Sequence, residues 1–83
     1  MFDKLKQINQ LKKLHDKMKE EKIVVVEKGV KVILNGNFEA EEIILNEELT
    51  PEEQAETLKY CFNKAIQEIQ AKVAQNFSHL INA

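Results

Sequence analysis

The hydrophobic residues of this 83-residue chain change their spacing twice, and this change constrains the fold more than any other feature. Over residues 2–22 they recur at steps of three and four, the spacing of one helix face. Between residues 23 and 45, β-branched residues gather and then alternate with other residues, as they do in strands. From residue 51 the helical spacing returns and continues to residue 80. The pattern predicts an α+β fold with a helix, a group of strands and a second helix.

Three short strands are expected between the helices. The first is residues 23–26, and Glu27-Lys28-Gly29 follows it as a turn or bulge. The second strand, residues 30–34, leads into Asn35-Gly36. Asn-Gly between two strand-like runs predicts a type I′ hairpin turn with positive φ at both central residues. A third run, residues 38–45, completes a three-stranded antiparallel meander.

The second helix has a clear start. Thr50 can cap it, Pro51 suits the first helical position, and Glu53 can return the capping hydrogen bond. Its apolar stripe comprises Ala55, Leu58, Phe62, Ala65, Ile66, Ile69, Val73, Phe77 and Leu80. This stripe is longer than the sheet of a small domain can cover. We therefore expect part of it to pack on the sheet and part on another chain.

The chain is short enough to be a single domain, residues 1–83, with a thin core. Such domains usually need disulfides, a structural metal or a partner subunit. The single cysteine excludes an intrachain disulfide, and the two histidines have no metal-ligand spacing, so no metal or other cofactor is expected. Association with a second copy of the chain is therefore the source of stability that we expect. The chain also lacks an apolar run that could cross a membrane or serve as a secretory signal, which favours the cytoplasm and no membrane partner.

The net charge is −2, but the charged residues are unevenly distributed. Residues 1–22 hold seven lysines and four acidic residues, whereas residues 23–58 hold two lysines and nine glutamates. Residues 59–83 hold three lysines and one glutamate. Both ends are therefore basic, and such asymmetry can create a local basic surface on an acidic protein.

The residues that catalysis usually needs are scarce. Ser78 is the only serine and has no activating glycine-flanked turn, and two glycines cannot make a phosphate-binding loop. Glu41 and Glu42 are adjacent in a strand and should point to opposite faces, which separates them as an acid/base pair. Cys61 lies on the apolar stripe and is expected to be a buried small hydrophobe. His15 is expected to be packed or at an interface. We predict neither an enzyme nor a small-molecule substrate.

A lysine-rich face runs along the first helix, away from its apolar stripe. Lys6, Lys13 and Lys17 share this face with Gln10. Lysine attracts phosphate as a point charge with little sequence preference. The chain has no arginine, so it cannot recognise guanine through two hydrogen bonds from a guanidinium group. The same pattern is, however, typical of any soluble amphipathic helix.

Several strings, taken in order, resemble the YbaB/EbfC family of bacterial nucleoid-associated, DNA-binding proteins. Residues 5–22 are similar to the family's opening helix, rich in lysine, glutamine and methionine. Residues 30–36 are similar to its V-K-V-x-[IV]-N-G hairpin, the most specific match. Ile43-Ile44-Leu45-Asn46 falls where the family has a strand end of the form I-x-I-[DN]. Phe62-Asn63-Lys64-Ala65 matches its [FL]-N-x-A string.

The resemblance implies an intertwined, tweezer-like homodimer that binds duplex DNA at low sequence specificity in the nucleoid. It assigns the DNA contacts to the projecting helices, here Lys6, Lys13, Lys17 and Lys64. The chain departs from the family at Glu41 and Glu42, where many members have basic residues. The acidic central segment, residues 23–58, and the missing arginine leave a second hypothesis open, a dimeric protein-interaction module of the same fold without nucleic-acid binding.

Overall fold

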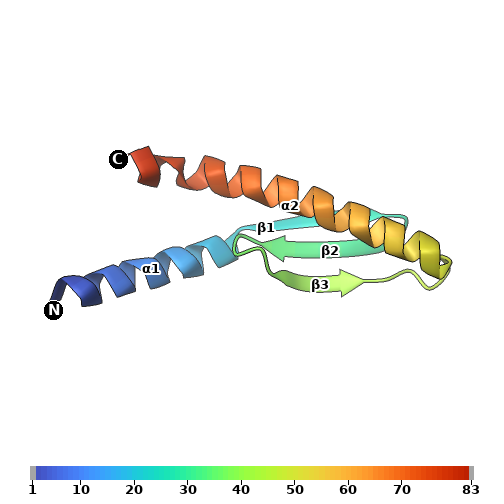
Figure 1. The fold of residues 1–83 in the computed structure, drawn as a ribbon, viewed down its shortest axis with the longest axis horizontal. Helices are drawn as coiled ribbons and strands as arrows, with labels where there is room; N and C mark the ends of the chain where they lie inside the picture. Colours follow the sequence, from blue (N-terminus) through green and yellow to red (C-terminus); the bar gives the residue numbers. More distant parts are fainter. Residues whose placement is uncertain (1, 83) are drawn as a thin grey trace.

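The computed structural model describes the backbone of residues 2–82 and the side chains of residues 8–76. It contains five elements in the predicted order (Figure 1). They are α1 (Phe2–Glu20), β1 (Lys22–Glu27), β2 (Val30–Asn35), β3 (Ala40–Ile44) and α2 (Pro51–Asn82). The α+β fold with an antiparallel meander is therefore confirmed.

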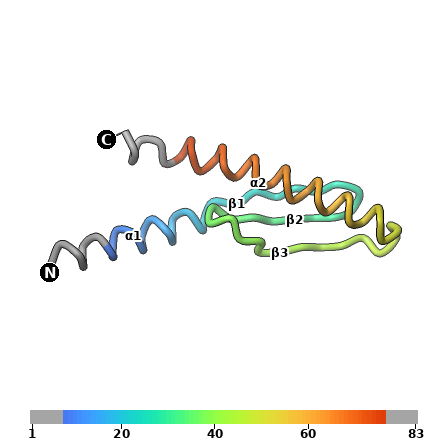
Figure 2. Tube along the Cα trace, viewed as in Figure 1, coloured from blue at the N-terminus to red at the C-terminus, as the bar shows by residue number. Residues whose placement is uncertain are grey.

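The molecule is elongated, measuring 56 × 23 × 15 Å, because its helices extend beyond the sheet. The sheet has the order β1-β2-β3, and α2 lies across β1 and β2 on one of its faces. The helix α1 leaves the sheet at the end where β1 begins, and the C-terminal part of α2 extends past that same end (Figures 1 and 2). The helix α1 therefore forms a projecting arm.

The core lies between α2 and the centre of the sheet. The sheet contributes Val25, Val30, Val32 and Leu34, and α2 contributes Cys61, Ala65 and Ile69 at steps of four. The small side chains of Cys61 and Ala65 allow the helix to approach the sheet closely. The Cys61 thiol is fully buried, as predicted, with its sulfur 3.8 Å from the carbonyl oxygen of Val30. Burial raises the pKa of this thiol, and the nearby Glu27 carboxylate adds to the shift.

The start of α2 follows the predicted capping box. The backbone amide of Glu53 donates to Oγ1 of Thr50 over 3.1 Å, and the amide of Thr50 donates to Oε1 of Glu53 over 3.4 Å. The two bonds satisfy amide groups that a helix start otherwise leaves without partners. Val73 of α2 still packs against the core, after which the helix continues past the sheet.

The type I′ turn lies in the first hairpin and not in the second. Lys28 and Gly29 form a two-residue loop and have φ angles of 49° and 80°. Positive φ at both central residues is the signature of this turn. The prediction of a type I′ turn at Asn35-Gly36 was therefore wrong, whereas the hairpin predicted at that position is confirmed.

The second hairpin uses a three-residue loop because the Asn35 side chain organises the backbone differently. The amide of Phe38 donates to the carbonyl oxygen of Asn35 over 2.9 Å, and Phe38 itself takes the positive φ, 61°. Oδ1 of Asn35 accepts the amides of Asn37 and Glu39, over 2.9 and 3.2 Å. Asn35 is 1% exposed, so its side chain is fixed in this role. A type I turn followed by a left-handed residue is the usual three-residue hairpin loop.

A β-bulge in β3 changes the position of the two adjacent glutamates. The register shifts between Ile33 and Leu34, which adds a residue to β3 at this point. Glu41 then pairs with Lys22 over 3.0 Å and Glu42 with Lys31 over 3.9 Å. Both lysines belong to the sheet face opposite α2, as the strand register shows. The expectation that the two carboxylates point to opposite faces was wrong, because the extra residue reverses the alternation.

Candidate nucleic-acid interface

Two of the four predicted DNA-binding lysines lie exposed on the arm. Lys13 and Lys17 are one helical turn apart on α1, so both extend from the same face. Neither forms an ion pair with any residue whose side chain is described. Lys6 belongs to the same helix, but its side chain lies outside the described residues. The pair Lys13 and Lys17 is thus a free cationic surface on a projecting helix.

The arm exposes two further lysines besides the predicted ones. Lys12 and Lys19 lie off the predicted face, yet both are exposed because few neighbouring residues shield α1. Lys19 lies with Lys22 in a shallow hollow that Asp16, Glu20 and Glu41 also line. A prediction from residue spacing assumes that the apolar face of the helix is covered. It therefore could not show that Lys12 and Lys19, which lie nearer that face, are exposed.

The apolar side of the arm is also uncovered in the single chain. Ile8 is 59% exposed and Leu11 is 66% exposed. The His15 side chain is 62% exposed, with Nδ1 3.8 Å from a carboxylate oxygen of Asp16. His15 is therefore not packed within the chain, and its predicted place at an interface stays a prediction.

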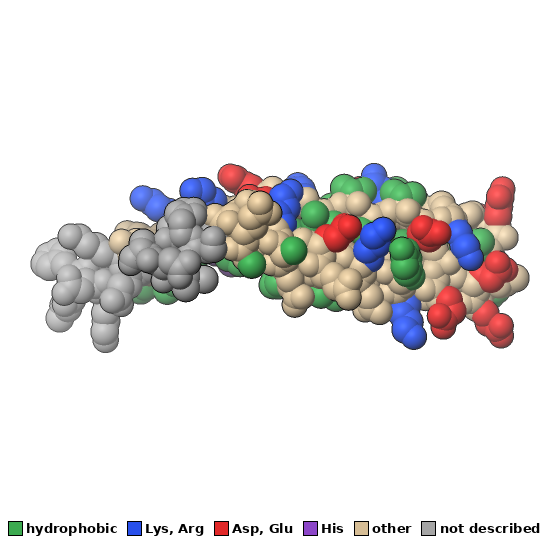
Figure 3. Space-filling model, turned by 90° about the horizontal axis from the view of Figure 1, so that it is seen from above, with side chains coloured by type: hydrophobic (Ala, Val, Ile, Leu, Met, Phe, Trp, Pro, Cys, Tyr) green, Lys and Arg blue, Asp and Glu red, His purple; other side chains and the backbone are tan. Residues whose placement is uncertain are grey.

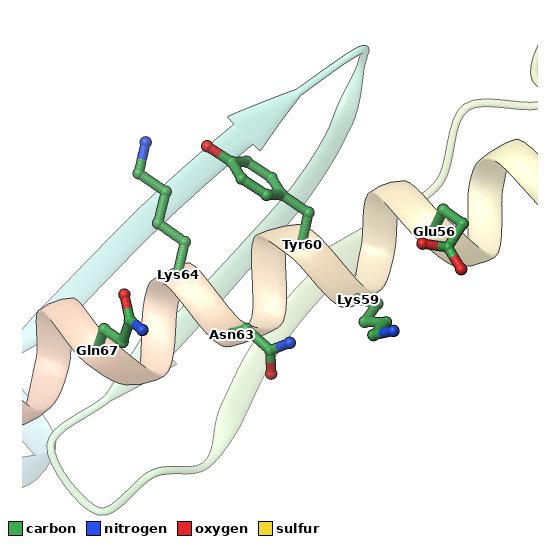
Figure 4. Close-up of a pocket in the computed structure, with 6 residues that line it drawn as sticks. All are labelled: Glu56, Lys59, Tyr60, Asn63, Lys64 and Gln67. Atoms are coloured by element: carbon green, nitrogen blue, oxygen red, sulfur yellow. The ribbon is translucent and has the colours of Figure 1, made fainter.

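Lys64 lies on a different surface from the arm lysines. It extends from the part of α2 that covers the sheet, with Nζ 5.7 Å from the centre of the Tyr60 ring. Figure 4 shows Lys64 and Tyr60 pointing the same way, whereas Lys59 and Asn63 leave the helix on another side. The structure therefore does not bring Lys64 together with Lys13 and Lys17.

Lys72 has a structural role that the sequence did not indicate. Its Nζ donates to the carbonyl oxygen of Lys22 over 3.0 Å and lies 3.5 Å from a carboxylate oxygen of Glu21. These two partners are at the junction of α1 and β1, so Lys72 ties α2 to the base of the arm. Its partners lie 50 or more positions away in the sequence, and no local pattern could have revealed them.

Charge is separated along the length of the molecule. The end that holds the start of α2 carries exposed acidic side chains: Glu47, Glu48, Glu52, Glu53 and Glu56. Figure 3 shows this acidic end opposite the end where the arm projects. The exposed glutamates therefore gather at one end of the molecule, and Lys13 and Lys17 lie toward the other end.

The described residues offer little for other kinds of site. They contain no group of three or more histidine, cysteine, aspartate and glutamate side chains placed to hold a metal ion. Within the same part of the chain, no helix combines the length and hydrophobicity that crossing a membrane requires. Glu41 and Glu42 each pair with a separate lysine, Lys22 and Lys31.

The fold and the free lysines define a small α+β protein with a cationic helical arm. A family model described as the YbaB/EbfC DNA-binding family matches residues 1–83. The chain therefore belongs to this family, which is a DNA-binding family and not an enzyme family. Comparisons with curated proteins and with solved structures gave no match.

Proposed function

We propose that this protein is a nucleoid-associated, cytoplasmic protein that binds the backbone of duplex DNA as a homodimer. One observation carries the proposal: Lys13 and Lys17 extend, exposed and without ion-pair partners among the described residues, from a projecting helix in a chain of a DNA-binding family. Lys6 would extend the same row toward the N-terminus. Lys64 would make at most a separate, subsidiary contact.

The chemistry of these residues fits phosphate recognition at low sequence specificity. A lysine ammonium group neutralises a phosphate charge and releases a counterion, whatever base is attached. Recognition of base edges usually requires planar or bidentate side chains. Arginine makes the commonest contact of this kind, and the chain has no arginine. Contacts to the DNA backbone and its shape therefore account for the expected binding.

A homodimer makes this weak surface more effective. Each chain offers a small number of free lysines on its arm, and contacts of this kind are individually weak. Two arms held in one dimer engage the same duplex at a high effective concentration. The proposed dimer therefore gives useful affinity without adding any new type of contact.

The experiment is a fluorescence-anisotropy titration of labelled duplex DNA at about 50 mM salt, where phosphate contacts are strong. The variant Lys13→Glu/Lys17→Glu should bind at least about 100-fold more weakly than the wild type. The control Lys28→Glu/Lys59→Glu changes the net charge equally but modifies exposed lysines off the arm. It should stay within about three-fold of the wild type. An equal loss of DNA affinity in both variants would mean that only the net charge matters. That result would refute a binding role for the arm.

A second candidate function is a dimeric protein-interaction module that does not bind nucleic acid. The acidic end, with its five exposed glutamates, favours it, because such a surface repels DNA and could attract a basic protein. Under this hypothesis the wild type shows no DNA binding at about 50 mM salt. The same titration therefore separates the two functions.

A further inference from the structure

The direction of the arm is set at its base, because little of its length packs on the rest of the chain (Figure 1). Between residues 8 and 20 only Leu14 and Met18 are half-buried, and the other side chains are exposed. Glu21 alone separates the end of α1 from the start of β1. A helix that is joined to a sheet through one residue can swing about that residue unless other contacts prevent it. The contacts at the base of the arm therefore decide where the arm points.

One of these contacts comes from α2 through Lys72. The Nζ atom of Lys72 donates to the carbonyl oxygen of Lys22 over 3.0 Å and lies 3.5 Å from Oε2 of Glu21. Lys72 thus binds the residue that links α1 to β1 and also the first residue of β1. Its own backbone is fixed, because Ile69 is fully buried one turn before it and the adjacent Val73 packs against the core. The core therefore holds the base of the arm through Lys72.

The second hairpin holds the same base from another element. The carbonyl oxygen of Met18, in the last turn of α1, accepts a hydrogen bond from the backbone amide of Gly36. The side chain of Lys22 pairs with Glu41 of β3 over 3.0 Å. A single point of attachment would leave the helix free to pivot, whereas attachments to different elements remove this freedom. Lys72 is the attachment that α2 supplies.

We propose that Lys72 is a positioning residue for DNA binding. Through Glu21 and Lys22 it fixes the direction in which the arm presents its free lysines. The inference rests on the proposed function, DNA binding through the arm. Lys13 lies roughly 12 Å from Glu21 along the helix axis, so a swing of about 20° would move it by roughly 4 Å. This displacement exceeds the length of a hydrogen bond to a phosphate oxygen, about 3 Å. An arm that is already fixed avoids the cost of being ordered when DNA binds.

Lys72 differs from the arm lysines because it is engaged within the chain. Its Nζ atom has two partners, whereas Lys13 and Lys17 have no ion-pair partner among the described residues. A lysine that contacts phosphate releases a counterion and so contributes to the salt dependence of binding. A lysine that only positions the arm changes the affinity and leaves the salt dependence as it was. The salt dependence therefore separates the two roles.

The first experiment measures the affinity for duplex DNA by fluorescence anisotropy at several salt concentrations. Lys72→Met removes the ammonium group and should bind about tenfold more weakly, with the same salt dependence as the wild type. The conservative variant Lys72→Arg keeps the charge and the donors and should stay within about threefold of the wild type. The matched control Lys59→Met removes an exposed lysine elsewhere on α2 and should bind as the wild type does.

The variant Glu21→Ala tests the same contact with the opposite change of charge. It removes the carboxylate that pairs with Lys72 and makes the protein less acidic, so net charge alone predicts stronger DNA binding. Positioning predicts weaker binding. Stronger binding by Glu21→Ala, or an unchanged affinity of Lys72→Met, would overturn the inference. A salt dependence shallower by about 1–2 in Lys72→Met would overturn it as well, because Lys72 would then contact phosphate itself.

A second experiment follows the arm in the absence of DNA. Spin labels are attached at Gln10→Cys on the arm and at Asn63→Cys on α2, and double electron–electron resonance measures the distances between them. Both positions are exposed, whereas Cys61 is fully buried and does not take up label. Dilution with unlabelled protein restricts the signal to pairs within one chain.

The distance distribution should broaden in Lys72→Met and stay unchanged in Lys59→Met. A distribution that Lys72→Met leaves unchanged would overturn the inference. If the wild type bound no DNA, the proposed function would fail, but the distances would still show whether Lys72 holds the arm. The failure of one is therefore distinguishable from the failure of the other.

Discussion

The backbone amide of Gly36 donates a hydrogen bond to the carbonyl oxygen of Met18 over 3.0 Å. The two residues join the last turn of α1 to the loop between β2 and β3. The approach is so close that a Cβ atom at position 36 would overlap the Met18 carbonyl group. A second bond, from Nδ2 of Asn37 to the carbonyl oxygen of His15 over 3.2 Å, lies one turn away. The base of the arm is thus fixed to the second hairpin.

Substitution of Gly36 by alanine should destabilise the protein strongly. The added methyl group displaces the Met18 carbonyl and removes a buried hydrogen bond, which together cost about 2–4 kcal/mol. Urea denaturation followed by circular dichroism measures this loss. The matched change Asn37→Ala removes only the exposed bond to His15 and should cost about 0.5 kcal/mol. Equal stability of Gly36→Ala and the wild type would contradict the contact between Gly36 and Met18.

Substitution of Lys28 by asparagine should stabilise the first hairpin. Lys28 holds a left-handed backbone conformation with φ of 49°, which asparagine adopts more readily than other non-glycine residues. The change also creates the Asn-Gly pair that type I′ turns favour. We expect the free energy of unfolding to rise by about 0.5–1 kcal/mol in urea titrations. The same change at the exposed helical position Lys59 should lower it slightly, because asparagine is a poorer helix former than lysine. A drop in stability for Lys28→Asn would exclude the type I′ turn.

The ion pair of Glu41 should make stability depend on pH in the acid range. The Lys22 ammonium group lowers the pKa of Glu41 below its ordinary value of 4.5, and the Asn35 side chain adds to this effect. The folded state therefore favours the ionised carboxylate, and the stabilisation is fully present above the unfolded pKa. It is lost as the pH falls through the lower folded pKa. Glu41→Gln should have a smaller decrease in stability between about pH 5 and 3 than the wild type. Parallel pH profiles for the two proteins would disprove this contribution.

Most of the fold could be predicted because its signals are local in the sequence. The capping box of Thr50 and Glu53 and the stripe containing Cys61 each lie within one element, and the structure confirms both. The type of the second turn could not be predicted from the sequence. The backbone conformation of Asn35 depends on the burial of its side chain, and that of Gly36 depends on its contact with Met18. These are tertiary effects that override local preference.

The candidate site was only partly predictable for a similar reason. Helical spacing correctly placed Lys13 and Lys17 on one face of α1, because that inference needs nothing beyond the helix itself. It could not show that Lys64 lies on another surface or that Lys72 is bound to the base of the arm. It also missed the pairing of Glu41 with Lys22, which depends on the β-bulge. Long-range geometry decides which lysines stay free.

The dependence of DNA affinity on salt tests the central claim most directly. The logarithm of the binding constant should fall linearly with the logarithm of the salt concentration, with a slope of about −0.9 for each neutralised phosphate. Lys13→Gln/Lys17→Gln removes four lysines from a dimer, so it should make the slope shallower by about 3–4. Lys28→Gln/Lys59→Gln should leave the slope unchanged. A slope that is the same in the wild type and in Lys13→Gln/Lys17→Gln would contradict DNA binding through the arm.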